Sequence, residues 1–557
     1  MARGARSLST RTAGLLLALA FALIAAGVIL VVVVRGQGSG AGLGSASSDL
    51  GVPVRPPESG RGVQGARDTR VQFADRHDPS RVASELQWAT LDPRERGRAD
   101  VTEPRAWVYF KDGRVGHVKA QRGQLYMPEQ GKHPETGTFV GGVLGRVFGP
   151  RPPGDTRPID PETDTPEVLF FAETIEFNMP MGSITTSDEF RVESSEVTFR
   201  ARGLVLHWNE VRDRVELFQT DGNNSLQYVR RPGATNPMQH RAPPAPESAS
   251  VPGTGPAGAA AQAPRAPRLD FYKAVLAGHV ELAQNQRLLT SDNLDLWVRL
   301  VDRRLAPGAL GPATPQAPGS AGDGAAPPPP PPAETGAELA PAPADAPTGA
   351  GAITLSWSGP LTVRPMEAAP PELARDDVAL RFTADGSNTV GLRDTAAGLT
   401  GACAWLAYGA TSRLVTLAGR GPVDVRLADA RGSAIESDRV EIAVAARTAH
   451  VPGAGRLLRD AGSDRAGAAP PAITWREQAD FVFEPGAGTD SWRLREALLA
   501  GSVAAQDGPR ALRGESFHAY FAPAPDGRPL LGRLVIQEQA VADGQSAGSL
   551  RASRIDI

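Results

Sequence analysis

Apolar and polar side chains alternate along much of the chain after residue 66, and the clearest run is 274–298, AVLAGHVELAQNQRLLTSDNLDLWV. Polar residues such as His279, Glu281 and Asp295 lie between its apolar positions. A period of two places successive side chains on opposite faces of an extended strand, so this run predicts two half-buried strands joined by a turn. The apolar positions that alternate in this way are Leu276, Val280, Leu282, Leu294, Leu296 and Val298.

The same pattern returns further along the chain, in 414–444, 496–521 and 531–557. The copy at 414–444 carries a three-residue insertion. Four copies indicate a repeated strand pair. In the other three copies the matching apolar positions are fourteen residues apart: Val280 and Leu294, Val503 and Phe517, Val541 and Ile555.

Short strand patterns also follow one another from 69 to 229, as in the alternation of Ile175, Phe177 and Met179. Outside the apolar run at 13–34, no segment shows a convincing 3.6-residue period over eleven positions. The sequence therefore predicts an all-β protein of the sandwich, jelly-roll or solenoid type.

Residues 13–34 are 22 consecutive apolar residues, enough for a helix that crosses a bilayer. Arg3, Arg6 and Arg11 precede this span, whereas only Arg35 follows closely. The charge excess predicts an uncleaved single-pass anchor in the inner (cytoplasmic) membrane, with a cytoplasmic tail of residues 1–12 and the bulk of the chain in the periplasm. A cleaved signal peptide is the alternative, although no small-x-small site follows the apolar run at once.

Composition divides the rest of the chain into β blocks and linkers. Residues 35–66 are a Gly/Ser-rich spacer, and the tracts 232–267 and 306–350 are rich in proline. The second tract contains thirteen prolines and no aromatic residue, Val or Ile, so it offers little to bury and is expected to be disordered. A short linker, 461–472, precedes the last block. The resulting β blocks are 67–231, 268–305, 351–460 and 473–557.

Little in the sequence points to catalysis. A formal net charge of -3 lacks the basic field that nucleic-acid binding requires. The single cysteine, Cys403, excludes an intrachain disulfide and lies among small and apolar residues. Residues 544–548 match the esterase pattern G-x-S-x-G, but they fall at a predicted hairpin turn instead of a strand-to-helix elbow. We predict a protein that is not an enzyme and has no cofactor.

Acidic residues recur at matching repeat positions, at Asp292, Asp438 and Glu515. Calcium binding is one interpretation of this recurrence. An acidic residue beside a polar turn is more often solvated, so we favour a structural role and predict no metal site.

The repeat opens with a strand of the pattern a-G-x-V-x-[L/V] and continues with a strand of the pattern s-[D/E]-x-[L/V/F]-x-[L/A/V]. The matching pieces are AGHVELAQ with TSDNLDLWV, AGRGPVDVRLAD with ESDRVEIAV, and AGSVAAQDG with RGESFHAYF. These pieces resemble the OstA-like module of the lipopolysaccharide-transport bridge, the family of LptC, LptA and the periplasmic part of LptD. The short tail, the single anchor and ITTSDEFRVESSEVTFRARGLVLHWNEVRDRVELFQ look like LptC. The length, the proline-rich tracts and the several β blocks depart from it.

The resemblance implies antiparallel jelly-roll repeats, each a folded-over sheet, that shield the acyl chains of a lipopolysaccharide-type lipid in an apolar slot. It also implies two kinds of partner: inner-membrane transporter components, and another OstA-like β protein at the C-terminal edge, 550–557. A filled core requires the same alternation as a slot, so a structural β-solenoid scaffold of the cell envelope is the alternative function. The side chains expected to face the lipid are Phe177, Phe190, Phe199, Leu206, Leu276, Val280, Leu294 and Leu296.

Overall fold

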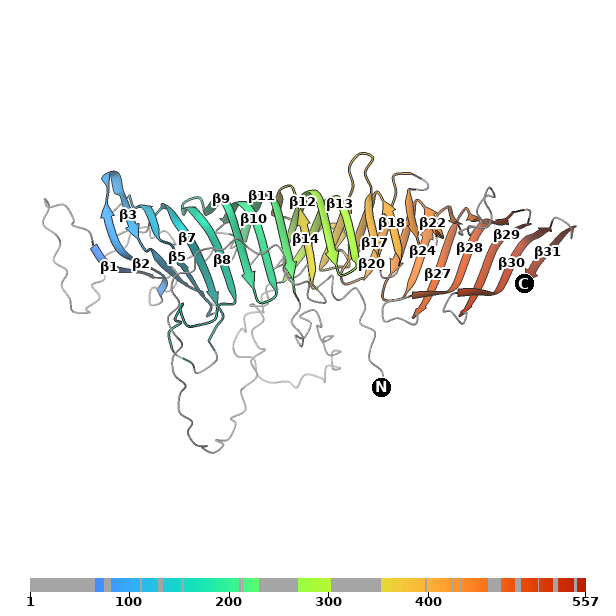
Figure 1. Ribbon diagram of the computed structural model, residues 1–557, viewed down its shortest axis with the longest axis horizontal. Coiled ribbons are helices and arrows are strands. Elements are labelled where there is room, and N and C mark those ends of the chain that lie inside the picture. Colours follow the sequence, from blue (N-terminus) through green and yellow to red (C-terminus); the bar gives the residue numbers. More distant parts are fainter. Residues whose placement is uncertain are drawn as a thin grey trace, which may run out of the picture.

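The structure is a computed structural model, shown in Figure 1. The predicted membrane span at 13–34, the spacer that follows it and both proline-rich tracts lie outside the residues that the structure describes. Within the described part of the chain, no helix is both long and apolar enough to cross a membrane. The described residues are 66–74, 82–110, 113–128, 134–151, 155, 157–209, 212, 214–229, 269–301, 352–395, 398–421, 424–430, 432–458, 472–485, 492–508, 510–523, 529–544 and 548–557.

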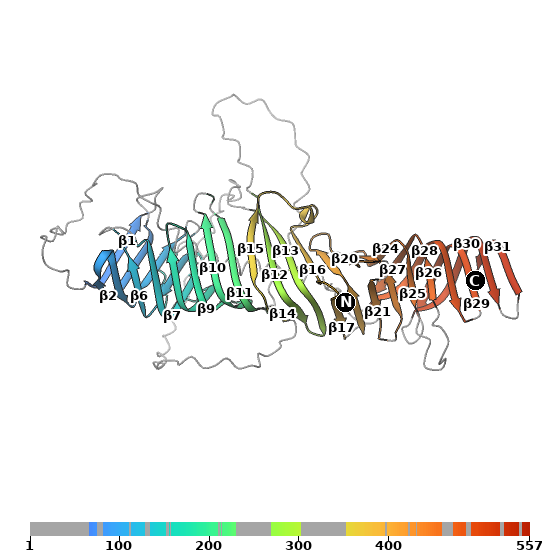
Figure 2. The ribbon, with the colours of Figure 1, turned by 90° about the horizontal axis from the view of Figure 1, so that it is seen from above.

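The described strands form one 31-stranded sheet, and the strand pairings within it are antiparallel. The predicted all-β class is therefore confirmed, and the separate β blocks of the sequence join into one sheet. Figures 1 and 2 show the strands in a row along the long axis of the molecule, from β1 at one end to β31 at the other. Among the described residues, two short 3₁₀ helices, η1 (Glu95–Gly97) and η3 (Pro371–Leu373), lie between strands.

Most of the long strands are bent near their middle, and six of them pair along one edge with two different strands, one on each side of the bend. The strands with long continuous spans are β1 (Ala66–Ala74), β2 (Val82–Pro93), β7 (Thr136–Phe148), β8 (Val168–Asn178), β9 (Ser183–Ser194), β10 (Val197–Asn209), β11 (Arg214–Tyr228), β12 (Leu269–Gln284), β13 (Arg287–Val301), β28 (Trp492–Asp507), β29 (Arg510–Pro523), β30 (Pro529–Gly544) and β31 (Gly548–Asp556).

The remaining strands are shorter, and consecutive pairs of them play the part of one bent strand. They are β3 (Arg98–Thr102) with β4 (Arg105–Tyr109), β5 (Val115–Lys119) with β6 (Arg122–Tyr126), β14 (Ile353–Trp357) with β15 (Leu361–Met366), β16 (Val378–Thr383) with β17 (Val390–Asp394), β18 (Leu399–Cys403) with β19 (Trp405–Gly409), β20 (Leu414–Ala418) with β21 (Val425–Ala428), β22 (Ala434–Ser437) with β23 (Arg439–Ala443), β24 (Thr448–Pro452) with β25 (Gly455–Leu458), and β26 (Ala472–Trp475) with β27 (Gln478–Pro485).

The bends fold the sheet over into two walls. Residues 271–276 of β12 pair with β15, whereas residues 281–284 of the same strand pair with β14. We call the half-sheet that contains 271–276 wall A and the half-sheet that contains 281–284 wall B. The line of bends between them is the corner.

The repeated sequence motifs lie at this corner. In the a-G-x-V motif, Gly278 has φ +75° and Gly501 has φ +80°, a left-handed conformation that glycine adopts without strain. In the s-[D/E] motif, the Ser291 hydroxyl donates to the backbone oxygen of Asn293 and the Ser437 hydroxyl donates to that of Arg439, both at 3.0 Å. The repeat is therefore a signal for bending a strand as well as for burying one of its faces.

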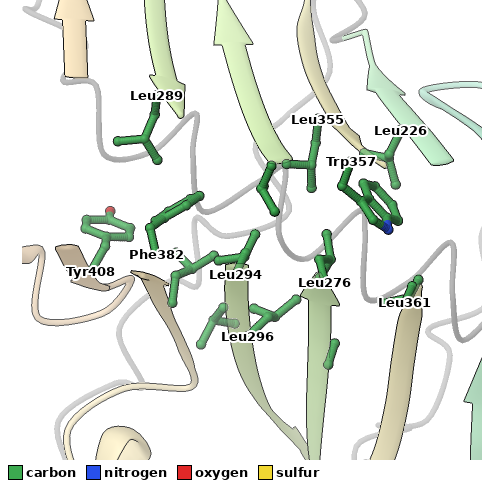
Figure 3. Packing of buried hydrophobic residues seen from close by; sticks show 14 of the residues in the cluster. Leu226, Leu276, Leu289, Leu294, Leu296, Leu355, Trp357, Leu361, Phe382 and Tyr408 are labelled. Atoms are coloured by element: carbon green, nitrogen blue, oxygen red, sulfur yellow. The ribbon is translucent and has the colours of Figure 1, made fainter. Parts of the chain in front are cut away.

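The alternation places one apolar set of side chains between the two walls. Leu276 pairs with Leu361 and Leu294 in wall A, and Leu282 pairs with Leu355 and Leu289 in wall B. Figure 3 shows that side chains from the two walls converge here on one apolar interior. One cluster of buried apolar residues extends from Phe73 in β1 to Ile555 in β31. The core is therefore continuous along the molecule.

The order of strands in the sheet departs from the order in the chain at one place. β11 pairs with β14 and β15, which pair in turn with β12. β13 then pairs with β16 and β17. The β12–β13 hairpin thus lies between two bent strands that follow each other directly in the chain.

The two faces of β12 predict opposite responses to the same new charge. Val280 is fully buried, so Val280→Asp would place an unpaired carboxylate in an apolar interior and is expected to reduce the free energy of unfolding by several kcal/mol. His279 is exposed and has φ +42°, a conformation that Asp tolerates, so His279→Asp is expected to change it by less than about 1 kcal/mol. Urea denaturation of both variants measures the difference. Equal losses would show that the two faces are wrongly assigned.

Candidate functional site

The candidate site is the inner face between the two walls, because this is where the eight predicted lipid-facing residues come together. All eight belong to the continuous apolar cluster. None has more than 7% of its surface exposed, and Phe199, Leu206, Leu276 and Val280 have none. Phe177, Leu206, Leu276, Leu294 and Leu296 lie in wall A, Phe190 and Phe199 lie in wall B, and Val280 lies at the corner.

Aromatic rings concentrate in one stretch of this inner face. The rings of Phe170 and Phe190 are 5.9 Å apart, and those of Phe190 and Phe199 are 5.7 Å apart. Phe199 also stacks on Trp357 of β14, at 6.2 Å. Trp357 was missed in the sequence, although the alternation in ITLSW could have indicated its inward orientation. The stack ties β8, β9 and β10 to the bent strand formed by β14 and β15.

The inner face is filled by its own side chains. A small cavity near Phe177 and Phe139 has a volume of only about 30 Å³. A much larger hollow, of about 1330 Å³, lies on the outer face of wall A. Across its floor run the outward side chains of five neighbouring strands, which are polar: Asp100, Gln124, Thr138, Glu176 and Thr185. This outer hollow cannot shield acyl chains.

Toward the open side of the fold, away from the corner, the inner face is less completely covered. Leu282, Leu392 and Ile473 of wall B and Val415 and Phe483 of wall A are only partly buried and pack against the cluster. Each wall therefore has partly exposed apolar side chains between the filled corner and the edge of the wall that lies farthest from the corner.

At β30 and β31 the inner face becomes exposed. Leu531, Leu550 and Ile557 are 55%, 57% and 61% exposed, in contrast to Ile536 and Ile555 nearer the corner, which are buried. β31 pairs with β30 along one edge. Among the described residues, no strand pairs with its other edge.

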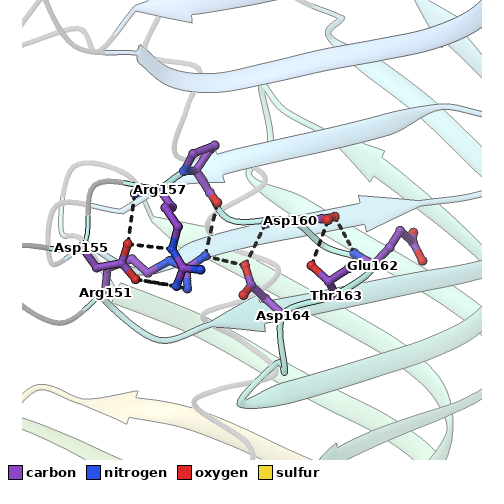
Figure 4. Close-up of polar contacts among 8 residues, drawn as sticks. Arg151, Asp155, Arg157, Asp160, Glu162, Thr163 and Asp164 are labelled. Atoms are coloured by element: carbon purple, nitrogen blue, oxygen red, sulfur yellow. Dashed lines mark hydrogen bonds and ion pairs between the residues drawn. The ribbon is translucent and has the colours of Figure 1, made fainter. Parts of the chain in front are cut away.

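A polar segment covers part of the outer face of wall B near β5 and β7 (Figure 4). Within it, Arg151 binds the Asp164 carboxylate at 2.5 Å, and Arg157 holds Asp155 and lowers the pKa of that carboxyl to about 2. Glu162 joins the segment to the sheet through Lys119 at 3.0 Å and Arg146 at 3.2 Å. Arg146 also donates to the backbone oxygen of Pro161 at 2.6 Å.

His117 of β5 lies on this part of wall B and is 2% exposed. Its ring is 4.7 Å from that of Trp107. Neither ring nitrogen has a hydrogen-bond partner among the described residues. Burial, with the nearby positive charges of Arg146 and Lys119, lowers the pKa of His117 to about 4. The imidazole is therefore neutral at physiological pH.

The three recurring acidic residues lie at the corner. The Asp292 carboxylate accepts the backbone N–H of Asp385 at 2.7 Å and the Nδ2 of Asn388 at 3.0 Å, and these hydrogen bonds lower its pKa. Asp438 accepts the backbone N–H of Gly419 through its backbone oxygen. Glu515 follows Gly514 at the bulge of β29. The acidic position therefore belongs to the bend, and in the described residues no group of three or more His, Cys, Asp or Glu side chains could hold a metal ion.

The cysteine and the G-x-S-x-G pattern at 544–548 also lie where they serve the fold. Cys403 is 1% exposed, and burial raises its pKa to about 12, so its thiol is protonated and inaccessible. Gly544 pairs with Gly548 at the end of the β30–β31 hairpin, where the sequence placed a turn.

No known family model matches the chain, and none of the curated protein sequences matches it.

The buried neutral His117 makes stability depend on pH. Its pKa in the folded chain, about 4, lies below the ordinary value of 6.5, so the unfolded chain binds the additional proton first as the pH falls. The contribution of neutral His117 to the free energy of unfolding is fully present above pH 6.5. It is lost between pH 6.5 and 4, by about 3 kcal/mol at most. Urea denaturation at several pH values should show a smaller decline over this window for His117→Gln than for the original chain. An equal decline in the free energy of unfolding for both proteins would contradict a lowered pKa of His117.

Proposed function

We propose that the chain is a membrane-anchored periplasmic bridge that carries a lipopolysaccharide-type lipid with its acyl chains between the two walls. The observation that carries the proposal is the single apolar cluster that extends without interruption from β1 to β31. A lipid that crosses an aqueous space gains about 0.8 kcal/mol for each methylene that is kept from water. A short apolar site would shelter it at one point only, whereas a continuous inner face shelters it along the whole path.

Entry of acyl chains requires the walls to part, because the inner face is filled by its own side chains. Apolar side chains of the two walls fill the space between them, and Leu276 of wall A and Leu355 of wall B belong to the same cluster. Such contact is non-directional, so an acyl chain can replace it without leaving a polar group unsatisfied. The hydrogen bonds of the sheet run between neighbouring strands and are not broken when the walls separate. The partly buried residues, such as Leu282 and Leu392, are then the first to meet the lipid.

The alternative is a structural scaffold, whose core would stay closed. The filled interior favours this alternative, whereas the exposed inner side chains of Leu531, Leu550 and Ile557 favour the bridge, because apolar surface of the inner face is open there to a lipid or to a second protein.

A photo-crosslinker distinguishes the two functions. The full chain is expressed in its own cells with p-benzoylphenylalanine in place of Leu282, which faces inward, or in place of Glu281, the outward control next to it. We expect illumination to attach an acylated lipid, detected by mass spectrometry of the purified protein, at position 282 at least tenfold more than at 281. A scaffold would give no lipid adduct at either position.

The bridge also needs a neighbour that continues its inner face. The free edge of β31 exposes a row of backbone N–H and C=O groups, and the exposed inner residues Leu550 and Ile557 lie beside it. Natural proteins normally cover or blunt such an edge, so this one suits the addition of a strand from another protein. The partner is a second folded-over β protein with an apolar inner face.

Ser553 is exposed on β31 and reports on this edge. A photo-crosslinker at Ser553 is expected to capture a β-rich envelope protein, whereas one at Arg513 of β29, away from the edge, is not. Capture of only intrachain neighbours from Ser553 in functional cells would refute the docking edge. It would leave the lipid result at Leu282 unaffected.

A further inference from the structure

The β12–β13 hairpin is inserted between two bent strands that follow each other in the chain. β14 with β15 forms the first of these strands, and β16 with β17 forms the second. The hairpin is joined to the rest of the chain by long connections, with 40 residues between β11 and β12 and 51 between β13 and β14. A chain of 40 residues can span more than about 100 Å, so the hairpin can leave its place while it stays tethered.

The two bent strands on either side of the hairpin can pair with each other. The hairpin contributes two strands, so its neighbours run antiparallel to one another, like adjacent strands elsewhere in this sheet. The register can be followed across it. Leu361 pairs with Leu276, Leu276 with Leu294, and Leu294 with Phe382. Without the hairpin, Leu361 would lie opposite Phe382 in wall A.

Wall B gives the same result. Leu355 pairs with Leu282, Leu282 with Leu289, and Leu289 with Leu392. Direct pairing would therefore place Leu355 opposite Leu392. In both walls, direct pairing would place inward residues opposite inward residues. Every inward side chain would therefore remain inward after the hairpin leaves. A slip of one residue would reverse the faces, and this register avoids it.

The connection between β15 and β16 is long enough both to cross the inserted hairpin and to join the two bent strands if they pair directly. It consists of the eleven residues 367–377, whereas four residues connect β19 to β20 and four connect β23 to β24. The short connections join bent strands that are direct neighbours. The longer one now crosses the ends of β12 and β13, and it is long enough to serve as an ordinary loop if the hairpin leaves.

This connection fastens the hairpin from outside. Leu373 of η3 packs with Trp297 of β13 in a small apolar cluster on the outer face of wall A. Arg299 of β13 donates to the backbone oxygen of Leu373 at 2.5 Å and pairs with Asp377 at 3.3 Å. Elsewhere the structure has no comparable crossing of two strands among the described connections. We call residues 367–377 the strap.

We propose that β12–β13 is a removable hairpin, held by the strap, and that the sheet has a second arrangement in which β14 and β15 pair directly with β16 and β17. Withdrawal of the hairpin shortens the row of strands by two strand spacings, about 10 Å, and keeps the inner face continuous. The inference depends on the register of the sheet and not on the proposed lipid.

Disulfide trapping tests the second arrangement in the full chain. Thr354 and Arg393 face outward in wall B, whereas the strap packs on Trp297 in wall A. They are now separated by both strands of the hairpin, at about 14 Å, which is too far for a disulfide. Direct pairing of the two bent strands would make them opposite neighbours. We expect Thr354→Cys with Arg393→Cys, in a Cys403→Ala background, to form the disulfide over hours under mild oxidation.

Two further pairs interpret the result. Ser356→Cys with Thr395→Cys has the same sequence separation of 39 residues but lies four residues out of the direct register, so it should remain reduced unless the chain unfolds. Thr354→Cys with Ala283→Cys, which are paired in the structure, should oxidise fastest and hold the hairpin in place. Trp297→Ala, which weakens the strap, should accelerate the 354–393 disulfide at least threefold and leave the 356–395 pair unchanged.

Absence of the 354–393 disulfide, both in the double-cysteine chain and with Trp297→Ala added, would overturn the proposal. Oxidation of the 354–393 and 356–395 pairs at equal rates would also overturn it, because general unfolding would then explain both disulfides.

Discussion

Each bent strand must satisfy two ladders of hydrogen bonds at once, one in each wall, and the rest of the structure depends on this constraint. A strand can do so only if its backbone turns at the corner without losing the alternation of its side chains. Gly278 and Gly501 supply the left-handed conformation, and the Ser291 and Ser437 hydroxyls each donate to the backbone oxygen two residues further along the chain. Because the bends recur at the same level in successive strands, the two half-sheets face each other along the whole molecule.

The same constraint makes the molecule extendable. A bent strand interacts mainly with its two neighbours, so a strand pair can be added at an end or inserted in the middle without changing the others, as in repeat proteins. The exposed inner residues beside β31 and the out-of-order hairpin β12–β13 are two consequences of this modularity. Both preserve the inner apolar face, because the backbone of a strand can form its hydrogen bonds with any neighbouring strand that has the correct register.

Polar interactions are distributed over the outer faces and the corner. Glu162 fastens a covering segment over His117, Arg299 fastens the strap, and Asp292 fixes a turn at the corner. Such ion pairs and hydrogen bonds at partly exposed positions contribute little to stability individually. They determine which segment covers which part of the sheet, whereas the apolar interior supplies most of the free energy that keeps the walls together.

The sequence by itself determined the all-β class, the repeated strand pair and most of the inward side chains, because a period of two follows directly from the geometry of a strand. The eight candidate residues, from Phe177 to Leu296, all belong to one inner cluster for that reason. Val541, an apolar position of one repeat copy, is an exception, since it pairs with Arg513 and Arg551 on the outer face. Only the tertiary structure decided that β14 and β15 precede β12 in the sheet, because backbone hydrogen bonds do not encode which strand is the neighbour. It also decided that the interior is filled, since a slot and a core require the same alternation. The burial of His117 could not be predicted either, because it results from a segment more than 30 residues away that folds back over β5.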